Sequence, residues 1–103
     1  MEFEAGLVET VSIRAETRLD EIMSRYAAGD DNAFAALYRE LEPRLYRFCL
    51  RLCGRKQDAD DVFQDACLRL HRARFTYVPG APTLPWAFAI ARSAYLDRLR
   101  KRR

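Results

Sequence analysis

The chain has 103 residues, of which 50% are hydrophobic and 32% are charged. This balance argues against a disordered chain, and the length suits one small domain with a single core. The formal net charge of +3 is unevenly distributed: residues 1–31 have a net charge of −5 and residues 75–103 have a net charge of +5. The basic C-terminal third predicts a polyanionic partner.

The sequence gives no sign of export or membrane insertion. Its acidic start differs from the basic start of a secretory signal peptide, so we expect a cytoplasmic protein. Residues 75–91 carry no charge, but three prolines interrupt them and the stretch is short for a bilayer-spanning helix. We therefore expect no membrane insertion.

The first predicted helix lies near the N-terminus. Residues 1–15 show no sustained hydrophobic period, and we expect a tail or a short helix there. From Glu16 to Ala28 apolar residues recur at helical spacing, which predicts a helix that ends before Gly29. Its predicted core stripe is Leu19, Ile22, Met23 and Tyr26.

A second helix of more than twenty residues is predicted after Asp30 and Asp31, which can cap its start. Pro43 lies inside this helix and should kink or divide it, and Gly54 should end it. Its predicted core stripe is Phe34, Leu37, Tyr38, Leu41, Leu45, Phe48 and Leu52.

A third helix is predicted to begin with Asp58 as its N-cap and to run to Arg74. One face should be buried through Ala59, Val62, Phe63, Ala66, Cys67 and Leu70. The other face carries Asp61, Gln64, Asp65 and Leu68. A solvated acidic face is the simpler interpretation, but a leucine among exposed acids and an amide is typical of a docking surface for a basic helix.

Residues 75–82 are predicted to form a loop, because proline and glycine break both helix and strand patterns there. Thr83 is the predicted cap of a fourth helix, whose core stripe is Trp86, Ile90, Ala91 and Ala94. Tyr77, Tyr95 and the C-terminal cations are not needed for this core. Aromatic rings beside cations are typical of single-stranded nucleic-acid binding, in which bases stack at about 1–3 kcal/mol each and cations contact phosphates. The four helices together predict an all-α protein, a compact bundle of three to four helices.

The sequence gives little support for metal binding or for catalysis. Cys49, Cys53, Cys67 and His71 have spacings like those of zinc ligands. In an antiparallel pair of the second and third helices, however, Cys67 and His71 would lie roughly 12 Å or more from Cys53. The cysteines are better explained as small buried groups, so we expect no metal and no other cofactor. The sequence also lacks catalytic motifs, and we expect no enzymatic activity.

Three segments in this order resemble region 2 of an extracytoplasmic-function (ECF) sigma factor. They are AGDDNAFAALYRELEPRLYRFCLRLCG, DADDVFQDACLRLHR and PWAFAIARSAYLDRLRKRR. The resemblance covers about residues 25–103, and it implies that residues 16–103 form a sigma region 2 helical domain. It also implies a transcription initiation factor domain that binds the β′ clamp helices of RNA polymerase core and melts the promoter −10 element.

The resemblance also implies roles for individual residues. The polymerase-binding residues would be Asp61, Gln64, Asp65, Leu68 and Arg72. The DNA-binding residues would be Tyr77, Arg92, Ser93, Tyr95, Arg98, Arg100 and Lys101. The loop that captures a flipped base of the non-template strand would be Phe75, Thr76, Tyr77, Val78, Pro79, Gly80, Ala81, Pro82 and Thr83. The family often has Asn where this chain has Ser93, and Arg where it has Ala89.

Such sigma factors usually continue into a second helical domain that reads the promoter −35 element, and no segment here fits that role. We expect either that the chain is a piece ending after region 2 or that a separate partner supplies the second domain. Two alternative functions stay open. One is a docking module whose main partner is an inhibitory anti-sigma protein, and the other is a redox or metal sensor based on the three cysteines.

Overall fold

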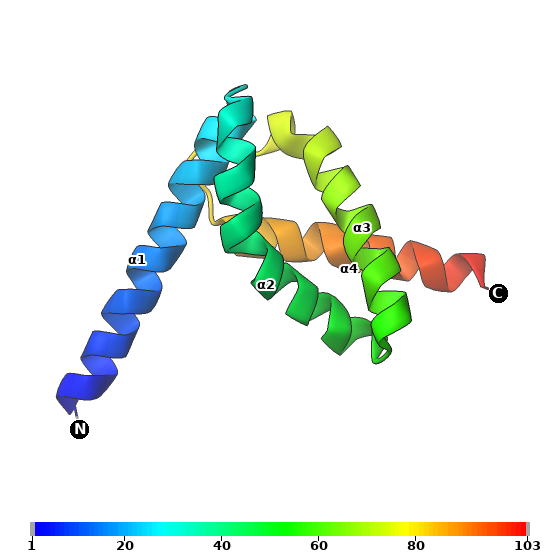
Figure 1. Cartoon of the computed structure of the whole chain (residues 1–103), viewed down its shortest axis with the longest axis horizontal. Coiled ribbons are helices and arrows are strands. Elements are labelled where there is room, and N and C mark those ends of the chain that lie inside the picture. The colour runs from blue at the N-terminus through cyan, green and yellow to red at the C-terminus, as the bar shows by residue number, and fades with distance from the viewer. Residues whose placement is uncertain (1, 103) are drawn as a thin grey trace.

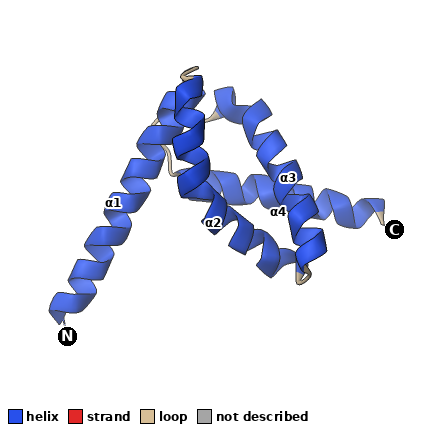
Figure 2. Ribbon diagram, in the orientation of Figure 1, coloured by secondary structure: helices blue, strands red, loops and turns tan. Residues whose placement is uncertain are grey.

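The computed structural model describes the backbone of residues 2–102 and the side chains of residues 14–102. Helices are the only regular secondary structure of these residues, and no strand is present in this range (Figures 1 and 2). The all-α fold class is therefore confirmed. The four α-helices are α1 Glu2–Ala27, α2 Phe34–Cys53, α3 Lys56–Ala73 and α4 Thr83–Lys101, and the short 3-10 helices are η1 Asp31–Ala33 and η2 Arg74–Thr76.

The helices pack in two layers. α2 and α3 form an antiparallel hairpin, and α4 crosses behind both of them (Figure 1). The C-terminal part of α1 packs against α2 and α4, whereas its N-terminal part extends away from the other helices in Figure 1. None of the described helices is long and apolar enough to cross a membrane.

The start of α1 differs from the prediction, and its end agrees with it. The helix begins at Glu2 instead of Glu16, so residues 2–15 continue the same helix. At the other end, Gly29 has a φ of 104°, and the Asp30 N–H donates to the Arg25 carbonyl at 3.0 Å. This backbone arrangement is a glycine-dependent helix stop.

α2 remains one helix through Pro43. The proline removes one backbone donor, and Figure 1 shows the axis of α2 bending near its middle. Gly54 ends the helix with a φ of 76°, and its N–H donates to the Leu50 carbonyl at 2.9 Å. The predicted kink and stop are therefore confirmed.

Both predicted N-caps of the later helices are wrong. α3 begins at Lys56, and Asp58 lies inside its first turn with its carboxylate directed to arginines of α4. Thr83 is the first residue of α4 and is fully buried. Its N–H donates to Asp20 Oδ1 at 2.8 Å, so a carboxylate from α1 satisfies the start of α4.

The core agrees with the predicted stripe of α1 and, apart from half-buried Cys67, with that of α3. It differs for α4 and for α2, where Phe48 and Leu52 are only half-buried. All four stripe residues of α1 are buried. In α2, Phe34 and Tyr38 are 46% and 45% exposed, and Cys49 is buried instead. In α4 the buried residues are Thr83, Ala87, Ala91 and Ala94, while Trp86 and Ile90 are only partly buried against them.

Candidate functional site

The outer face of α3 carries the residues predicted to bind a partner helix. Asp61, Gln64, Leu68 and Arg72 are all exposed, and they recur at helical spacing along one side. Leu68 is 48% exposed. Asp65 is half-buried and pairs with Arg69 Nη2 at 3.2 Å. The structure thus places all five predicted polymerase-binding residues on one helix, with an apolar residue at the centre of a polar surface.

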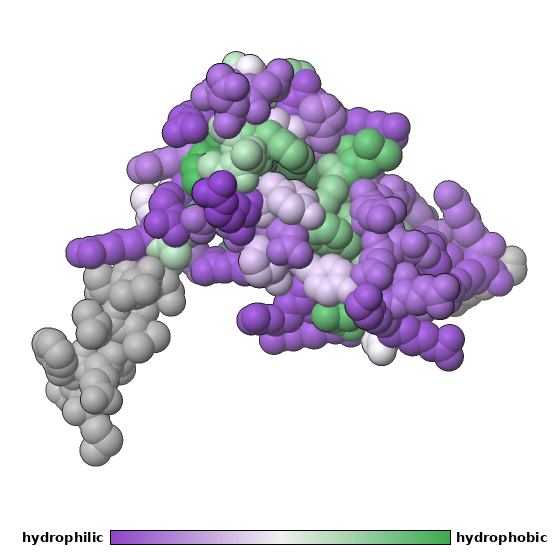
Figure 3. All heavy atoms as spheres, viewed as in Figure 1, coloured by the Kyte–Doolittle hydropathy of each residue, from purple (hydrophilic) through white to green (hydrophobic). Residues whose placement is uncertain are grey.

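An apolar groove of about 660 Å³ lies beside this face, between α2 and α3. Gln64 and Leu68 form part of its wall, and Phe34, Tyr38 and Phe63 form much of the rest. Figure 3 shows hydrophobic side chains gathered over α2 and α3 and surrounded by hydrophilic ones. The exposed apolar area beside Leu68 is therefore larger than the sequence indicated.

The sequence analysis assigned Phe34 and Tyr38 to the core, and the structure places them at the edge of this groove. The Phe34 ring lies 5.7 Å from the Tyr26 ring and 6.2 Å from the Tyr38 ring, which in turn lies 6.4 Å from Phe63. These rings form a continuous aromatic wall. The sequence carried no signal of this exposure, because the hydrophobic period of α2 does not show which part of the stripe another helix covers.

The loop between α3 and α4 presents two apolar side chains to solvent. Phe75 is 65% exposed and Val78 is 68% exposed. The guanidinium of Arg74 lies 4.2 Å from the centre of the Phe75 ring, a cation–π arrangement. The predicted base-capture loop therefore has an exposed aromatic ring beside a cation.

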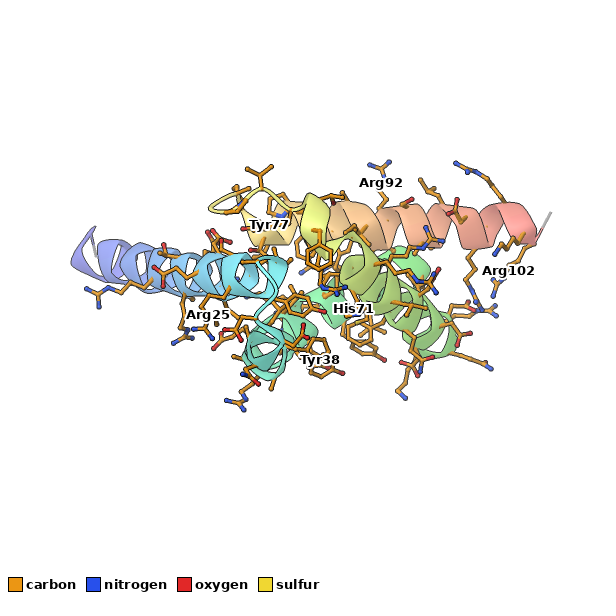
Figure 4. The ribbon with its side chains drawn as sticks, turned by 90° about the horizontal axis from the view of Figure 1, so that it is seen from above. Arg25, Tyr38, His71, Tyr77, Arg92 and Arg102 are labelled. Atoms are coloured by element: carbon orange, nitrogen blue, oxygen red, sulfur yellow. The ribbon has the colours of Figure 1, made fainter. Side chains whose placement is uncertain are left out.

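Tyr77 does not fit its predicted role as a DNA contact, because it is only 4% exposed. Its ring lies edge-on to Trp86 at 5.3 Å, and its hydroxyl donates to the Ala81 carbonyl. Figure 4 shows Tyr77 lying beneath the loop, next to α4. Tyr77 is a core residue that fixes the loop.

Two further contacts attach the loop to α1. The Gly80 N–H donates to Ser24 Oγ at 3.0 Å, and the Thr83 N–H donates to Asp20 Oδ1 at 2.8 Å. These bonds satisfy backbone donors that a loop rich in proline and glycine cannot pair within itself. The loop is thereby held in one conformation by residues that the sequence analysis did not single out.

The residues of α4 predicted to bind DNA lie on two different sides of the helix. Arg92, Ser93 and Arg100 surround a groove of about 540 Å³, whose apolar wall includes Phe48 and Phe88. These two rings stack at 4.4 Å. Arg92 projects away from the bundle in Figure 4. This side combines cations with an apolar surface, as single-stranded nucleic-acid binding requires.

The other side of α4 faces α3 and carries half-buried Tyr95 and the ion-paired Arg98. Arg98 Nη2 lies 3.0 Å from Asp61 Oδ2 and 3.3 Å from Asp58 Oδ1. Lys101 is exposed at the end of the helix. The cations predicted to bind DNA therefore differ in their pairing. Arg98 pairs with carboxylates of α3, and Arg100 Nη1 pairs with Asp97 Oδ1 at 3.1 Å, whereas Arg92 and Lys101 have no ion pair among the described side chains.

The three cysteines have environments that disfavour redox chemistry. All are free thiols, and burial raises the pKa of Cys49 and of Cys67 to about 11. Because the thiolate is the reactive species, a raised pKa lowers the reactivity of these two thiols at neutral pH. No cluster of potential metal ligands occurs among the described residues. The Nδ1 atom of His71 contacts the Tyr26 hydroxyl, and Arg74 Nη1 lies 3.3 Å from its Nε2 atom.

Comparison with known proteins identifies the family of the chain. Residues 37–103 match the sigma-70 region 2 family. The chain therefore belongs to the sigma-70 region 2 family.

Its curated relatives include ECF RNA polymerase sigma factors. It is 35% identical over 88 residues to the ECF RNA polymerase sigma factor SigM of Mycobacterium tuberculosis, covering 85% of this chain and 45% of that protein. It is 35% identical over 81 residues to the RNA polymerase sigma factor CarQ of Myxococcus xanthus, covering 79% and 47% respectively. It is also 25% identical over 88 residues to SigW of Bacillus subtilis, covering 85% and 47%. The chain spans about half the length of the curated relatives it matches.

Proposed function

We propose that this domain acts in transcription initiation by binding RNA polymerase core through α3 and promoter DNA through α4 and the loop before it. The observation that carries the proposal is the separation of two surfaces of opposite character. The outer face of α3 is acidic with an exposed leucine, and the outer side of α4 is basic, with the exposed ring of Phe75 in the loop before it. One surface suits a basic protein helix, and the other suits a nucleic-acid strand.

The polymerase contact would be made by Asp61, Gln64, Asp65, Leu68 and Arg72 with the clamp helices of the β′ subunit. Leu68 would insert as the apolar anchor while the surrounding acids and amide pair with basic and polar groups of that partner. The names of the relatives, RNA polymerase sigma factors, support this partner.

The DNA contact would melt the promoter −10 element and hold its non-template strand. Arg92, Ser93, Arg100 and Lys101 would contact phosphates along α4. A flipped base would be captured at the loop of residues 75–83, where Phe75 offers an exposed ring and Arg74 a cation for stacking. Catalysis would belong to the polymerase, and the domain would act in the cytoplasm, where polymerase is.

A second candidate function is docking of an inhibitory anti-sigma protein. The apolar groove beside Leu68 favours it, because the exposed aromatic wall of Phe34 and Tyr38 extends beyond the acidic face of α3. The inhibitor and polymerase would compete for Leu68, so one protein could carry out both functions at different times.

The test of the polymerase contact is binding of purified core polymerase to the immobilised domain. We expect the double substitution D61A/Q64A to weaken binding at least tenfold and to leave the melting temperature nearly unchanged, because both side chains are exposed. E16A/T17A is a matched control, because it also removes one carboxylate and one polar side chain, from exposed positions on α1. Equal core binding by both variants would contradict the proposed contact.

The test of the DNA contact is fluorescence anisotropy with labelled single strands that cover non-template −10 sequences, at two salt concentrations. We expect weak binding that depends on sequence and declines steeply with salt, because released counterions contribute most of the affinity. An affinity that is the same at low and moderate salt would contradict phosphate binding by α4.

A further inference from the structure

A group of ion pairs joins the two proposed surfaces at the start of α3 and the end of α4. Asp58 Oδ1 lies 2.6 Å from Arg102 Nη2 and 3.3 Å from Arg98 Nη2. Arg98 Nη2 also lies 3.0 Å from Asp61 Oδ2. Two carboxylates of α3 therefore pair with the guanidinium groups of Arg98 in α4 and of Arg102, which directly follows the helix.

The pairs are well formed at Asp58. Its side chain is 17% exposed, and the hydrogen bond from Arg102 is the main reason that the pKa of this carboxyl lies below its usual value. In Figure 4, Arg102 lies on the α3 side of the end of α4, whereas Arg92 projects away from the bundle. Arg92 thus has no ion pair among the described side chains, whereas carboxylates of α3 already occupy Arg98 and Arg102.

Carboxylates that pair with an arginine compete with any phosphate for the same N–H donors, and they lower the positive potential around it. A cationic side chain that approaches Asp58 or Asp61 has the opposite effect, because it competes with the arginine for the carboxylate. The arginine side chains are 34% and 53% exposed, so exchanging their partners costs the fold little.

We propose that these ion pairs couple the two surfaces: Asp58 and Asp61 weaken phosphate binding by Arg98 and Arg102 until basic groups of a protein partner on α3 take over the carboxylates. This inference rests on the proposed function, in which Asp61 meets a basic helix and α4 meets DNA. Because coupling between two binding sites is reciprocal, DNA bound to α4 also strengthens binding of the partner to α3.

The test is the affinity of the isolated domain for a labelled oligothymidylate, measured by fluorescence anisotropy at low salt. We expect Asp58→Asn to tighten binding about threefold to fivefold, the range set by one partly exposed ion pair. Asp61→Asn should give a smaller gain, because Arg98 keeps Asp58 as a partner. The salt dependence should also steepen in Asp58→Asn, since more cations reach phosphates.

Asp31→Asn is the matched control for charge. Asp31 is exposed in η1 and has no ion pair among the described side chains, so its substitution changes the net charge equally without releasing an arginine. We expect it to change the affinity less than twofold. Circular dichroism at the titration temperature checks that each variant is folded.

The double substitution R98Q/R102Q identifies the groups responsible. In this background Asp58→Asn should no longer tighten binding, because the arginines that it would release are gone. The coupling is overturned if Asp58→Asn gains no more than Asp31→Asn, if its gain survives in R98Q/R102Q, or if folded Asp58→Asn binds no oligonucleotide at all. Binding of core polymerase, measured separately, decides the proposed function, so the two ideas can fail independently.

Discussion

Two aromatic residues that are two positions apart, Phe75 and Tyr77, should respond in opposite ways to substitution. Tyr77 is 4% exposed and packs against Trp86, so Tyr77→Ala should cost about 3–5 kcal/mol through the cavity it leaves. For a domain of this size that corresponds to a loss of at least about 12 °C in melting temperature. Tyr77→Phe keeps the ring and removes the hydrogen bond to the Ala81 carbonyl, which should cost about 1 kcal/mol.

Phe75 is 65% exposed, and its contact with Arg74 contributes at most about 1 kcal/mol to the free energy of unfolding. Phe75→Ala should therefore leave the domain folded and weaken binding of a single strand by about 1–3 kcal/mol, the energy of one stacked base. Thermal unfolding and fluorescence anisotropy on the same samples separate the two effects. Equal destabilisation by Phe75→Ala and Tyr77→Ala, or unchanged DNA binding by Phe75→Ala, would refute the reasoning.

Three other properties can be tested on the isolated domain. Trp86→Ala should lower the free energy of unfolding in urea by about 2–4 kcal/mol, because the ring is partly buried against Tyr77; a loss below about 1 kcal/mol would mean that the ring contributes little packing. Hydrogen bonds from arginines hold the pKa values of Asp58 and Asp97 below the ordinary 3.8, so their stabilisation is complete above that value and is lost as pH falls below it. Chemical denaturation between pH 5 and pH 2 should thus show a shallower loss of stability in Asp58→Asn than in the wild type, and parallel curves would contradict this assignment. Finally, Cys49 and Cys67 should react slowly with iodoacetamide at pH 8, since burial raises the pKa of each to about 11; rapid alkylation of the folded protein, followed by mass spectrometry, would revive the redox alternative.

Hydrophobic period predicted the existence of each helix but not how much of each stripe is covered. Leu19, Ile22, Met23 and Tyr26 are buried because α1 meets two other helices, and the period alone identifies them. Phe34 has the same period and stays exposed, because no described element covers that end of the groove. The burial of a residue in a small bundle depends on which other helices pack over it, and the hydrophobic stripe of one helix does not contain that information.

The cap assignments failed for a related reason. Asp58 and Thr83 are residue types that favour N-caps, and both occur close to the true start of a helix. Each is used otherwise because a residue distant in sequence supplies a stronger partner: Arg102 for the carboxylate of Asp58, and Asp20 for the N–H of Thr83. The capping preference of a residue type did not decide its role here, because hydrogen bonds between residues distant in sequence did, and these bonds cannot be predicted from local sequence.

The bonds from α1 to the loop bear on where a functional fragment can begin. The family match starts at residue 37, yet Asp20 and Ser24 hold the backbone of Thr83 and Gly80. A fragment cut at residue 37 would retain every side chain proposed to touch DNA. Its loop would nevertheless sample many conformations. The conformational entropy lost when the loop becomes ordered on binding would then lower the affinity for the strand. In the proposed function, the first helix would therefore raise DNA affinity by keeping the loop ordered, in addition to the core packing that Leu19, Met23 and Tyr26 provide.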